Sequence, residues 1–272
     1  MTRITIGQFY PTKSPIHNLD PRVKLIGVFA HITALLLVNN FVGYGIAALY
    51  VAGVIKTSKV PVKLMIRGLR AVLFMLVFAV GINLFLTQGE SILLSVGFIT
   101  ITMEGLTLGG LMASRLIILV IGTSILTLTT SPTALTEGIE ALLRPLRHIK
   151  VPSHEIAMMM TIALRFIPTL ADELEKIIKA QKARGADFDT GNILKRAKSM
   201  LPILVPLFVS SFKRADELAT AMVARCYRGD TGRTKMKAMK MKKSDYLAIG
   251  VLLLASVATI STRFLFFSNA NY

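Results

Sequence analysis

The sequence predicts an all-α integral membrane protein with about five transmembrane helices, together with about three amphipathic helices in a cytoplasmic-side domain. Three observations support this fold class. The chain has 272 residues, is 53% hydrophobic and has a mean hydropathy of +0.61, which is more apolar than an ordinary soluble domain. Its apolar residues are grouped in long runs. Its formal net charge of +17 comes mainly from the segments between these runs.

Five apolar stretches are candidates for the transmembrane helices. A helix needs about 20 residues to cross the bilayer core, so the last two stretches are long enough and the third just qualifies. The first two are shorter, and Asn39-Asn40 separates them. In chain order, the stretches are Leu25–Val38, Phe41–Ile55, Ala71–Thr87, Leu106–Leu128 and Tyr246–Phe267.

Basic residues set the predicted orientation of these spans, because cytoplasmic loops carry an excess of Lys and Arg. The N-terminal segment and residues 56–70 are both basic, so Leu25–Ile55 is predicted to cross as two short helices that turn at Asn39-Asn40. Residues 88–105 contain no Lys or Arg, whereas residues 129–245 contain 21 of the 32. This distribution predicts a cytoplasmic N-terminus and an outside C-terminus.

The chain is accordingly divided into three predicted parts. Residues 1–128 hold the N-terminal segment and transmembrane helices 1–4, residues 129–245 form the cytoplasmic domain, and residues 246–272 hold the last transmembrane helix and the C-terminus. The basic run at residues 233–243 directly precedes the last span. This position favours contact with anionic lipid, and no nucleic-acid partner is predicted, because no nucleic-acid-binding signature accompanies the run.

The cytoplasmic part contains apolar runs that are too short to span, which is typical of buried or interfacial helices. From Leu164 to Ile178, apolar residues recur at spacings of three and four, and charged residues cover the other face. On that face, Asp172–Lys176 and Glu175–Lys179 are predicted to form favourable acid-then-base pairs four residues apart. This amphipathic helix is predicted to end near Gly185, which suits a left-handed C-cap. A second helix is predicted to continue to Gly229, and a shorter third one to be limited by Pro145.

Two of these helices end in the same pattern of Ala-Arg and a small residue, namely Ala183-Arg184-Gly185 and Ala224-Arg225-Cys226. In one interpretation, the two arginines are solvated charges of the kind that a helix C-terminus favours. In the other, small neighbours allow each helix end to enter a groove of another protein, where arginine binds a carboxylate bidentately. The repetition favours two similar grooves on two similar partner subunits.

Two arginines lie in apolar surroundings. Arg115 lies inside the fourth span, where a charge is costly, and it is expected to pair with Glu104 or Glu90 or to reach outward. A structural role is favoured over substrate contact. Arg165 is expected to pair with a carboxylate. The alternative function is a membrane-embedded enzyme acting on an anionic substrate, which Arg115, Glu104 and Arg165 would serve.

Asp20 and Arg22, with Lys24, either clamp the N-terminal segment to the amphipathic helices or cap a helix. Met158, Met159 and Met160 form either an adaptable contact surface or ordinary core. The four histidines lack ligand spacing, so no metal is assigned. No G-x-x-x-x-G-K-[ST] loop is present, so the chain is not expected to bind a cofactor or to hydrolyse ATP.

Three longer stretches carry a family resemblance. They are "SPIHNLDPRVKL" near the N-terminus, "RLIILVIGTSILTLTTSP" at the fourth span and its exit, and "IALRFIPTLADELEKIIKAQKARGADF", which is the most specific of the three. In these stretches and over nearly its whole length, the chain resembles the transmembrane coupling (T) component, EcfT, of energy-coupling-factor (ECF) ABC transporters.

The resemblance implies a noncatalytic coupling subunit of an importer in the prokaryotic cell membrane. Such T components join two cytosolic ABC ATPase subunits, which use ATP and Mg, to a small substrate-binding (S) membrane subunit for the uptake of vitamins or other micronutrients. Their two Ala-Arg-Gly motifs end coupling helices that dock in the ATPases, so Arg184 and Arg225 match the docking arginines. Cys226 replaces the second glycine. Met158–Met160 are expected to contact the substrate-binding subunit.

Overall fold

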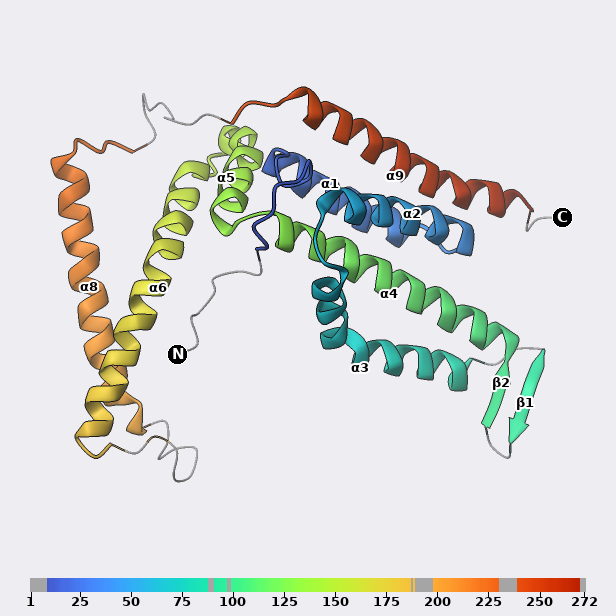
Figure 1. Ribbon diagram of the computed structural model, residues 1–272, viewed down its shortest axis with the longest axis horizontal. Coiled ribbons are helices and arrows are strands. Elements are labelled where there is room, and N and C mark those ends of the chain that lie inside the picture. Colours follow the sequence, from blue (N-terminus) through green and yellow to red (C-terminus); the bar gives the residue numbers. More distant parts are fainter. Residues whose placement is uncertain are drawn as a thin grey trace. The chain divides into compact units, whose positions relative to one another are not determined.

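The computed structural model describes residues 9–87, 91–96, 99–186, 188, 198–229 and 239–269 (Figure 1). These residues are mainly helical, as predicted. The helices are α1 (Pro21–Leu37), α2 (Phe41–Ser58), α3 (Val62–Leu86), α4 (Met103–Thr129), α5 (Pro132–Leu143), the 3-10 helix η1 (Arg144–Ile149), α6 (Ser153–Ala183), α8 (Leu201–Ala224) and α9 (Lys243–Asn269).

One short segment departs from the helical fold. Between α3 and α4, strands β1 (Ile92–Val96) and β2 (Ile99–Thr102) form an antiparallel pair. Their β-branched residues favour an extended backbone, which the hydropathy pattern alone does not reveal. Thr102 ends the second strand and caps α4, because its side chain accepts a hydrogen bond of 3.1 Å from the backbone N–H of Gly105.

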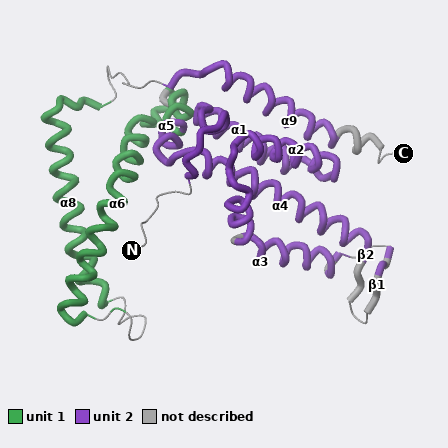
Figure 2. Tube along the Cα trace, in the orientation of Figure 1, with its two compact units in different colours: residues 1–6, 139–238 green, residues 7–138, 239–272 purple. Residues whose placement is uncertain are grey.

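The chain divides into two compact units (Figure 2). One unit contains η1, α6 and α8, and the other contains α1–α4, the two strands and α9. The boundary between the units falls inside α5, after Gly138. The last helix therefore belongs to the same unit as the first four, although 100 residues of the other unit lie between them in sequence.

Helices α1 and α2 are separate, as the basic residues on either side of them predicted. Helix α1 ends at Leu37, and α2 begins at Phe41. The side chain of Asn40 caps α2, accepting a hydrogen bond of 2.7 Å from the backbone N–H of Gly43. The break at Asn39-Asn40 is thus confirmed, and it has a local cause in asparagine capping chemistry.

Three of the described helices, α2, α4 and α9, are long and apolar enough to cross a membrane. Helix α3 adds a fourth span if its two parts, Val62–Arg70 and Val72–Phe85, act together across a bend of 60°. Helix α1 has 17 residues, which is at the lower limit for a span. The protein is therefore a multi-pass helical membrane protein, and the total of five spans stays a prediction.

Helices α4 and α9 each pack on both α1 and α2, and α3 packs along α4. Buried residues of α1, α2 and α4 form the core of this unit, including Leu35, Val38, Tyr44, Ala47, Val51, Ile118, Ile125 and Leu128. Large apolar side chains also cover the outside of these helices, and Phe74 of α3 is 83% exposed. Apolar exposure of this extent is expected on a surface that faces lipid.

Candidate functional site

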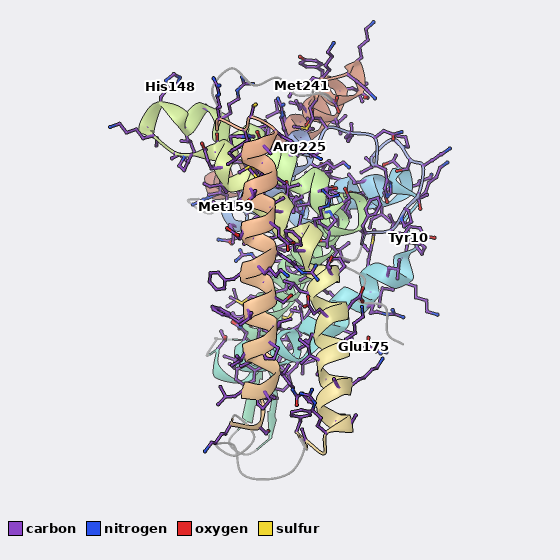
Figure 3. The ribbon with its side chains drawn as sticks, turned by 90° about the vertical axis from the view of Figure 1, so that its left-hand side faces the viewer. Tyr10, His148, Met159, Glu175, Arg225 and Met241 are labelled. Atoms are coloured by element: carbon purple, nitrogen blue, oxygen red, sulfur yellow. The ribbon has the colours of Figure 1, made fainter. Side chains whose placement is uncertain are left out.

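The two Ala-Arg motifs stand at the ends of α6 and α8, which form an antiparallel pair. Near the end of α6, Gln181 Nε2 donates a hydrogen bond of 3.3 Å to the carbonyl of Pro202 at the start of α8. Further along, Arg214 Nη2 donates to Glu173 Oε2 at 2.8 Å, and Ser210 Oγ donates to Glu173 Oε1. These contacts hold the two helices side by side (Figure 3).

The first motif ends α6 in a Schellman arrangement. Ala183 is the last helical residue, and Arg184 is the C-cap with φ −84° and ψ 6°. Gly185 has φ +83°, and its N–H donates to Lys182 O at 3.0 Å, while Ala186 N donates to Gln181 O at 3.0 Å. These two bonds satisfy carbonyls that the helix end would leave free. The predicted left-handed cap at Gly185 is confirmed.

The second motif repeats this geometry. Helix α8 ends at Ala224, not at Gly229 as the sequence predicted, and Arg225 is the C-cap with φ −91° and ψ 17°. Cys226 takes the left-handed position with φ +58°. Its N–H donates to Val223 O at 2.9 Å, and Tyr227 N donates to Met222 O at 3.0 Å. The cysteine therefore caps the helix as the glycine does.

All six residues of the two motifs are exposed. Within the described part of the chain, neither the Arg184 nor the Arg225 guanidinium has a hydrogen-bond or ion-pair partner. Because Gln181 lies beside Pro202, the first motif is near the start of α8 and the second is at its end. The 24 residues of α8 rise by about 1.5 Å each, so the motifs are about 35 Å apart. Two separate surfaces can therefore be contacted at once.

The charged face of α6 carries an ion pair within the helix. Lys179 Nζ lies 2.6 Å from Glu175 Oε1, which confirms the predicted acid-then-base pair four residues apart. The hydrogen bond and the charge of Lys179 hold the pKa of the Glu175 carboxyl below its ordinary value. Glu175 therefore stays ionised toward lower pH, and both groups remain on the solvent side of the helix.

An exposed apolar surface lies on α8, within one of the short apolar runs that the sequence assigned to buried or interfacial helices. Met159 is 59% exposed, whereas Met158 and Met160 are half-buried. On α8, apolar side chains at spacings of one, three and four are 51–65% exposed, and they are Leu201, Leu204, Val205, Phe208, Val209 and Phe212. This spacing is visible in the sequence, but only the structure shows that no described element covers the face.

The structure gives Arg115 neutral partners among the described residues, and Glu90, one of its two expected carboxylates, lies outside them. Arg115 Nε donates to Tyr44 Oη at 2.8 Å, and Nη2 donates to Val38 O at 3.0 Å and to Asn39 Oδ1. Neutral oxygens at the turn between α1 and α2 thus surround the charge. Arg165 is exposed on α6, and no described carboxylate lies within ion-pair distance of it.

Of the residues named for a membrane-embedded enzyme, Glu104 and Arg115 lie apart on α4. Glu104 accepts a hydrogen bond of 2.7 Å from Ser91 Oγ, and it lies eleven positions before Arg115 on α4. Eleven residues span about 16 Å along a helix. Within this unit, the described residues therefore do not bring Glu104 and Arg115 into one site.

Asp20 has a capping role, which was one of its two predicted interpretations. Its Oδ1 accepts a hydrogen bond of 2.9 Å from the backbone N–H of Arg22 at the start of α1. The N–H of Asp20 donates to Asp245 Oδ1 at 2.8 Å, and Asp245 Oδ2 also accepts from Lys242 N at 2.6 Å. Lys24 Nζ donates to the carbonyls of His17 and Thr129. These bonds join the start of α1 to the start of α9 and the end of α4.

Several of the described helices are apolar enough to span a membrane, and two long helices end in matching, exposed arginines. These features define the class as a multi-pass helical membrane protein. Comparison with known proteins agrees with this class. The family model described as "Cobalt transport protein" (CbiQ) matches residues 12–236.

The similar proteins named "Energy-coupling factor transporter transmembrane protein EcfT" match nearly the whole chain. The protein from Ruminiclostridium cellulolyticum is 52% identical over 97% of this chain and 98% of its own length. The one from Thermosediminibacter oceani is 50% identical over 97% and 100%, and the one from Clostridium kluyveri is 51% identical over 95% and 96%. The chain therefore belongs to the EcfT family of energy-coupling factor transporter transmembrane proteins.

Proposed function

We propose that the chain is the noncatalytic coupling subunit of an ECF-type ABC importer, and that it transmits the motion of two ATP-hydrolysing subunits to a substrate-binding membrane subunit. The importer takes up vitamins or other micronutrients. ATP and Mg belong to the ATPases, and this chain binds no cofactor. The chain lies in the prokaryotic cell membrane with its N-terminus in the cytoplasm and its C-terminus outside, because its basic segments gather on one side.

One observation carries this proposal, namely the repetition of one helix end at two places. Arg184 and Arg225 share the same C-cap conformation, the same pair of capping hydrogen bonds and the same exposure. A lone solvated arginine at a helix end needs no such repetition. Two matched ends about 35 Å apart suit two copies of one kind of groove, as two related ATPases would provide.

The antiparallel pair α6 and α8 provides the connection between these grooves and the membrane. Glu173, Ser210 and Arg214 tie the helices together, so a displacement at either arginine is transmitted along both. The exposed apolar face of α8, with Met159 of α6, is the surface on which the substrate-binding subunit packs. Closure of the ATPases then moves this face and reorients the bound subunit.

The test is the double variant Arg184→Ala with Arg225→Ala in the assembled transporter. Each arginine is expected to pair with a carboxylate that becomes buried on docking, and breaking such a pair costs roughly 3–5 kcal/mol. We expect the ATPase subunits to be lost on co-purification, or ATP hydrolysis to continue without substrate uptake. Co-purification, ATP hydrolysis and uptake are measured on the same preparation.

Arg165→Ala is the matched control, because Arg165 is also an exposed arginine of α6 but lies outside both motifs. It should retain the ATPases and the uptake activity of the unaltered chain. Normal uptake by the double variant would show that the two arginine ends are solvated charges without partners, and the docking proposal would then be wrong.

A further inference from the structure

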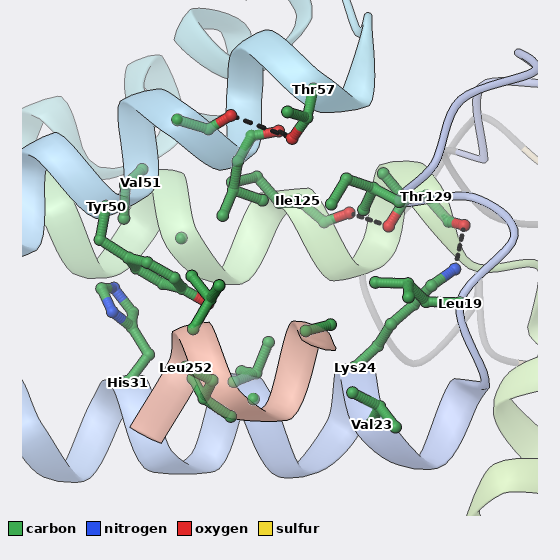
Figure 4. A pocket seen from close by; sticks show the side chains of 18 of the residues that line it. Leu19, Val23, Lys24, His31, Tyr50, Val51, Thr57, Ile125, Thr129 and Leu252 are labelled. Carbon is green, nitrogen blue, oxygen red and sulfur yellow. Dashed lines mark hydrogen bonds between the residues drawn. The ribbon is translucent and has the colours of Figure 1, made fainter. Parts of the chain in front are cut away.

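A cavity of about 620 Å³ lies among α1, α2, α4 and α9, entirely within one compact unit (Figure 4). It exists because α4 and α9 each pack on both α1 and α2, which leaves a space enclosed by the four helices. Its walls are mainly apolar and include Val23, Val51, Ile125, Leu126 and Leu252. Its volume is within the range of about 300–1,000 Å³ that is usual for small-molecule sites.

The cavity opens through the outer surface of two helices that can cross the membrane. Leu49 of α2 and Leu247 of α9 both line it, yet they are 75% and 71% exposed. Val251, one turn further along α9, is 51% exposed. Because α2 and α9 are candidate spans, this opening faces the hydrocarbon region of the bilayer. A lipid chain can therefore reach the cavity without passing through water.

One end of the cavity is basic. Lys24 lines it there, and its Nζ donates hydrogen bonds to the carbonyls of His17 at 3.1 Å and Thr129 at 3.0 Å. An ammonium group has three donors, so one remains for a ligand. Thr57 and Ser244 also line the cavity, and each adjoins an exposed lysine, Lys56 and Lys243 respectively.

The acidic groups at this end are already engaged. Asp20 accepts a hydrogen bond from Arg22 N, and Asp245 accepts from two backbone N–H groups. Both residues are buried, with exposures of 7% and 1%. The exposed charges that adjoin the cavity at this end are therefore positive, which suits an anionic group at the opening.

The opposite end is closed by His31 and Tyr50, whose ring centroids are 6.1 Å apart (Figure 4). His31 is seven positions after Lys24 on α1, which corresponds to about 10 Å of helix. Gly122 of α4 leaves room for the imidazole, because a Cβ there would lie 2.5 Å from His31 Nε2. His31 is only 7% exposed, so a membrane lipid reaches it only by entering the cavity.

We propose that this cavity binds an acyl chain of an anionic phospholipid, with the phosphate at the Lys24 end and the middle of the chain near His31 and Tyr50. Three observations support it together: apolar walls, an opening at the outer surface of two candidate spans, and Lys24 at one end, where Lys56 and Lys243 adjoin lining residues in sequence. Basic pockets between membrane-spanning helices are suited to anionic headgroups. None of the lining residues belongs to the arginine motifs, so the proposal does not depend on ATPase docking.

The test uses phosphatidylglycerol that carries a photoreactive diazirine near the middle of one acyl chain. The full chain is reconstituted in vesicles that contain this probe and is irradiated, and the labelled residues are located by peptide mass spectrometry. We expect labelling of His31 or Tyr50. The same probe built on phosphatidylcholine has a headgroup without net charge, and it should label them about tenfold less. This difference corresponds to about 1.4 kcal/mol of binding free energy.

A pair of glycine variants on α2 provides the matched comparison. Gly53 lines the cavity, and a Cβ there meets nothing within 4 Å, so Gly53→Phe fills the space without a clash near the backbone. Gly45 is also exposed on α2 with nothing within 4 Å, but it does not line the cavity. Gly53→Phe should abolish labelling of His31 and Tyr50, and Gly45→Phe should leave it unchanged.

Labelling confined to outward residues such as Phe74 would overturn the proposal, as would unchanged labelling of His31 and Tyr50 in Gly53→Phe. Equal labelling by the two headgroups would contradict the anionic specificity. Loss of labelling when a substrate-binding subunit is added would assign the cavity to a protein interface instead of a lipid.

Discussion

Arg184 and Arg225 occupy the same position in two helix ends that share their backbone course but differ in the residue that follows. Gly185 adopts φ +83° without a steric cost, whereas Cys226 adopts φ +58° with a Cβ that crowds the backbone. A non-glycine residue in this region is disfavoured by roughly 1–2 kcal/mol. Glycine and cysteine thus adopt the same left-handed backbone conformation, and the backbone is more strained at Cys226 than at Gly185.

Replacement of Cys226 by glycine is therefore expected to stabilise the end of α8. Cys226→Gly should raise the free energy of unfolding by about 1 kcal/mol, because it removes the left-handed strain and keeps both capping hydrogen bonds. Thermal unfolding of the purified chain measures the change. Gly185→Ala is the reverse substitution at the equivalent position and should destabilise the end of α6. A lower melting temperature for Cys226→Gly would contradict the prediction that left-handed strain at Cys226 destabilises the end of α8.

At the scale of elements, the antiparallel pair of α6 and α8 depends on Glu173 of α6. Its carboxylate accepts hydrogen bonds from Ser210 and Arg214 of α8. Arg214 and Glu173 are 34% and 22% exposed, so solvent screens their attraction. Each helix also contains a proline, Pro168 in α6 and Pro206 in α8, which removes one backbone hydrogen bond. Side-chain contacts between the two helices therefore matter more than propensity within either one.

The Glu173→Ala variant is expected to loosen this pair more than Arg214→Ala does. It removes two hydrogen bonds, whereas Arg214→Ala removes one, and the coupling energy between Glu173 and Arg214 should be about 1 kcal/mol or less. A double-mutant cycle on the melting temperature measures it. Glu175→Ala is the control on the same helix, since Glu175 pairs with Lys179 of α6 and not with α8. An equal effect of Glu173→Ala and Glu175→Ala would show that the contact does not join the helices.

At the scale of the whole molecule, Asp245 connects parts of the chain that are 225 positions apart. Its carboxylate accepts hydrogen bonds from the backbone N–H of Asp20 at the start of α1 and from that of Lys242, directly before α9. Asp245 is only 1% exposed. At the other end of the same helices, Asn40 and Thr262 exchange hydrogen bonds, with Asn40 Nδ2 donating to Thr262 O at 3.0 Å. Polar contacts therefore hold α9 at both ends.

Asp245→Asn is expected to destabilise the unit that contains α1–α4 and α9. An amide has one acceptor oxygen, so one backbone N–H loses its partner in a buried place, at a cost of about 1–3 kcal/mol. The melting temperature should fall, and backbone hydrogen exchange should increase at the starts of α1 and α9. Asp216→Asn on the exposed surface of α8 should change neither. Unaltered exchange at α1 in Asp245→Asn would refute the connection.

The parts of this molecule that were predicted from sequence depend on residues close together in the chain. Asn40 begins α2, Gly185 caps α6, and Lys179 pairs with Glu175 one turn away. Each is decided by a capping or spacing preference that acts over about four residues. The family and the membrane class were also accessible, because apolar runs and motif stretches are read directly from the sequence.

The parts that were wrong or missed depend on residues far apart. Arg115 meets Tyr44 and Val38, which are 71 and 77 positions away, so no local pattern named these neutral partners in place of a carboxylate. Cys226 is not a usual left-handed residue, and the hydrogen bonds of the α8 end override its preference. The cavity among α1, α2, α4 and α9 likewise arises from packing between both ends of the chain. Local chemistry decides where helices begin and end, but only tertiary packing decides which side chains meet and what space remains between them.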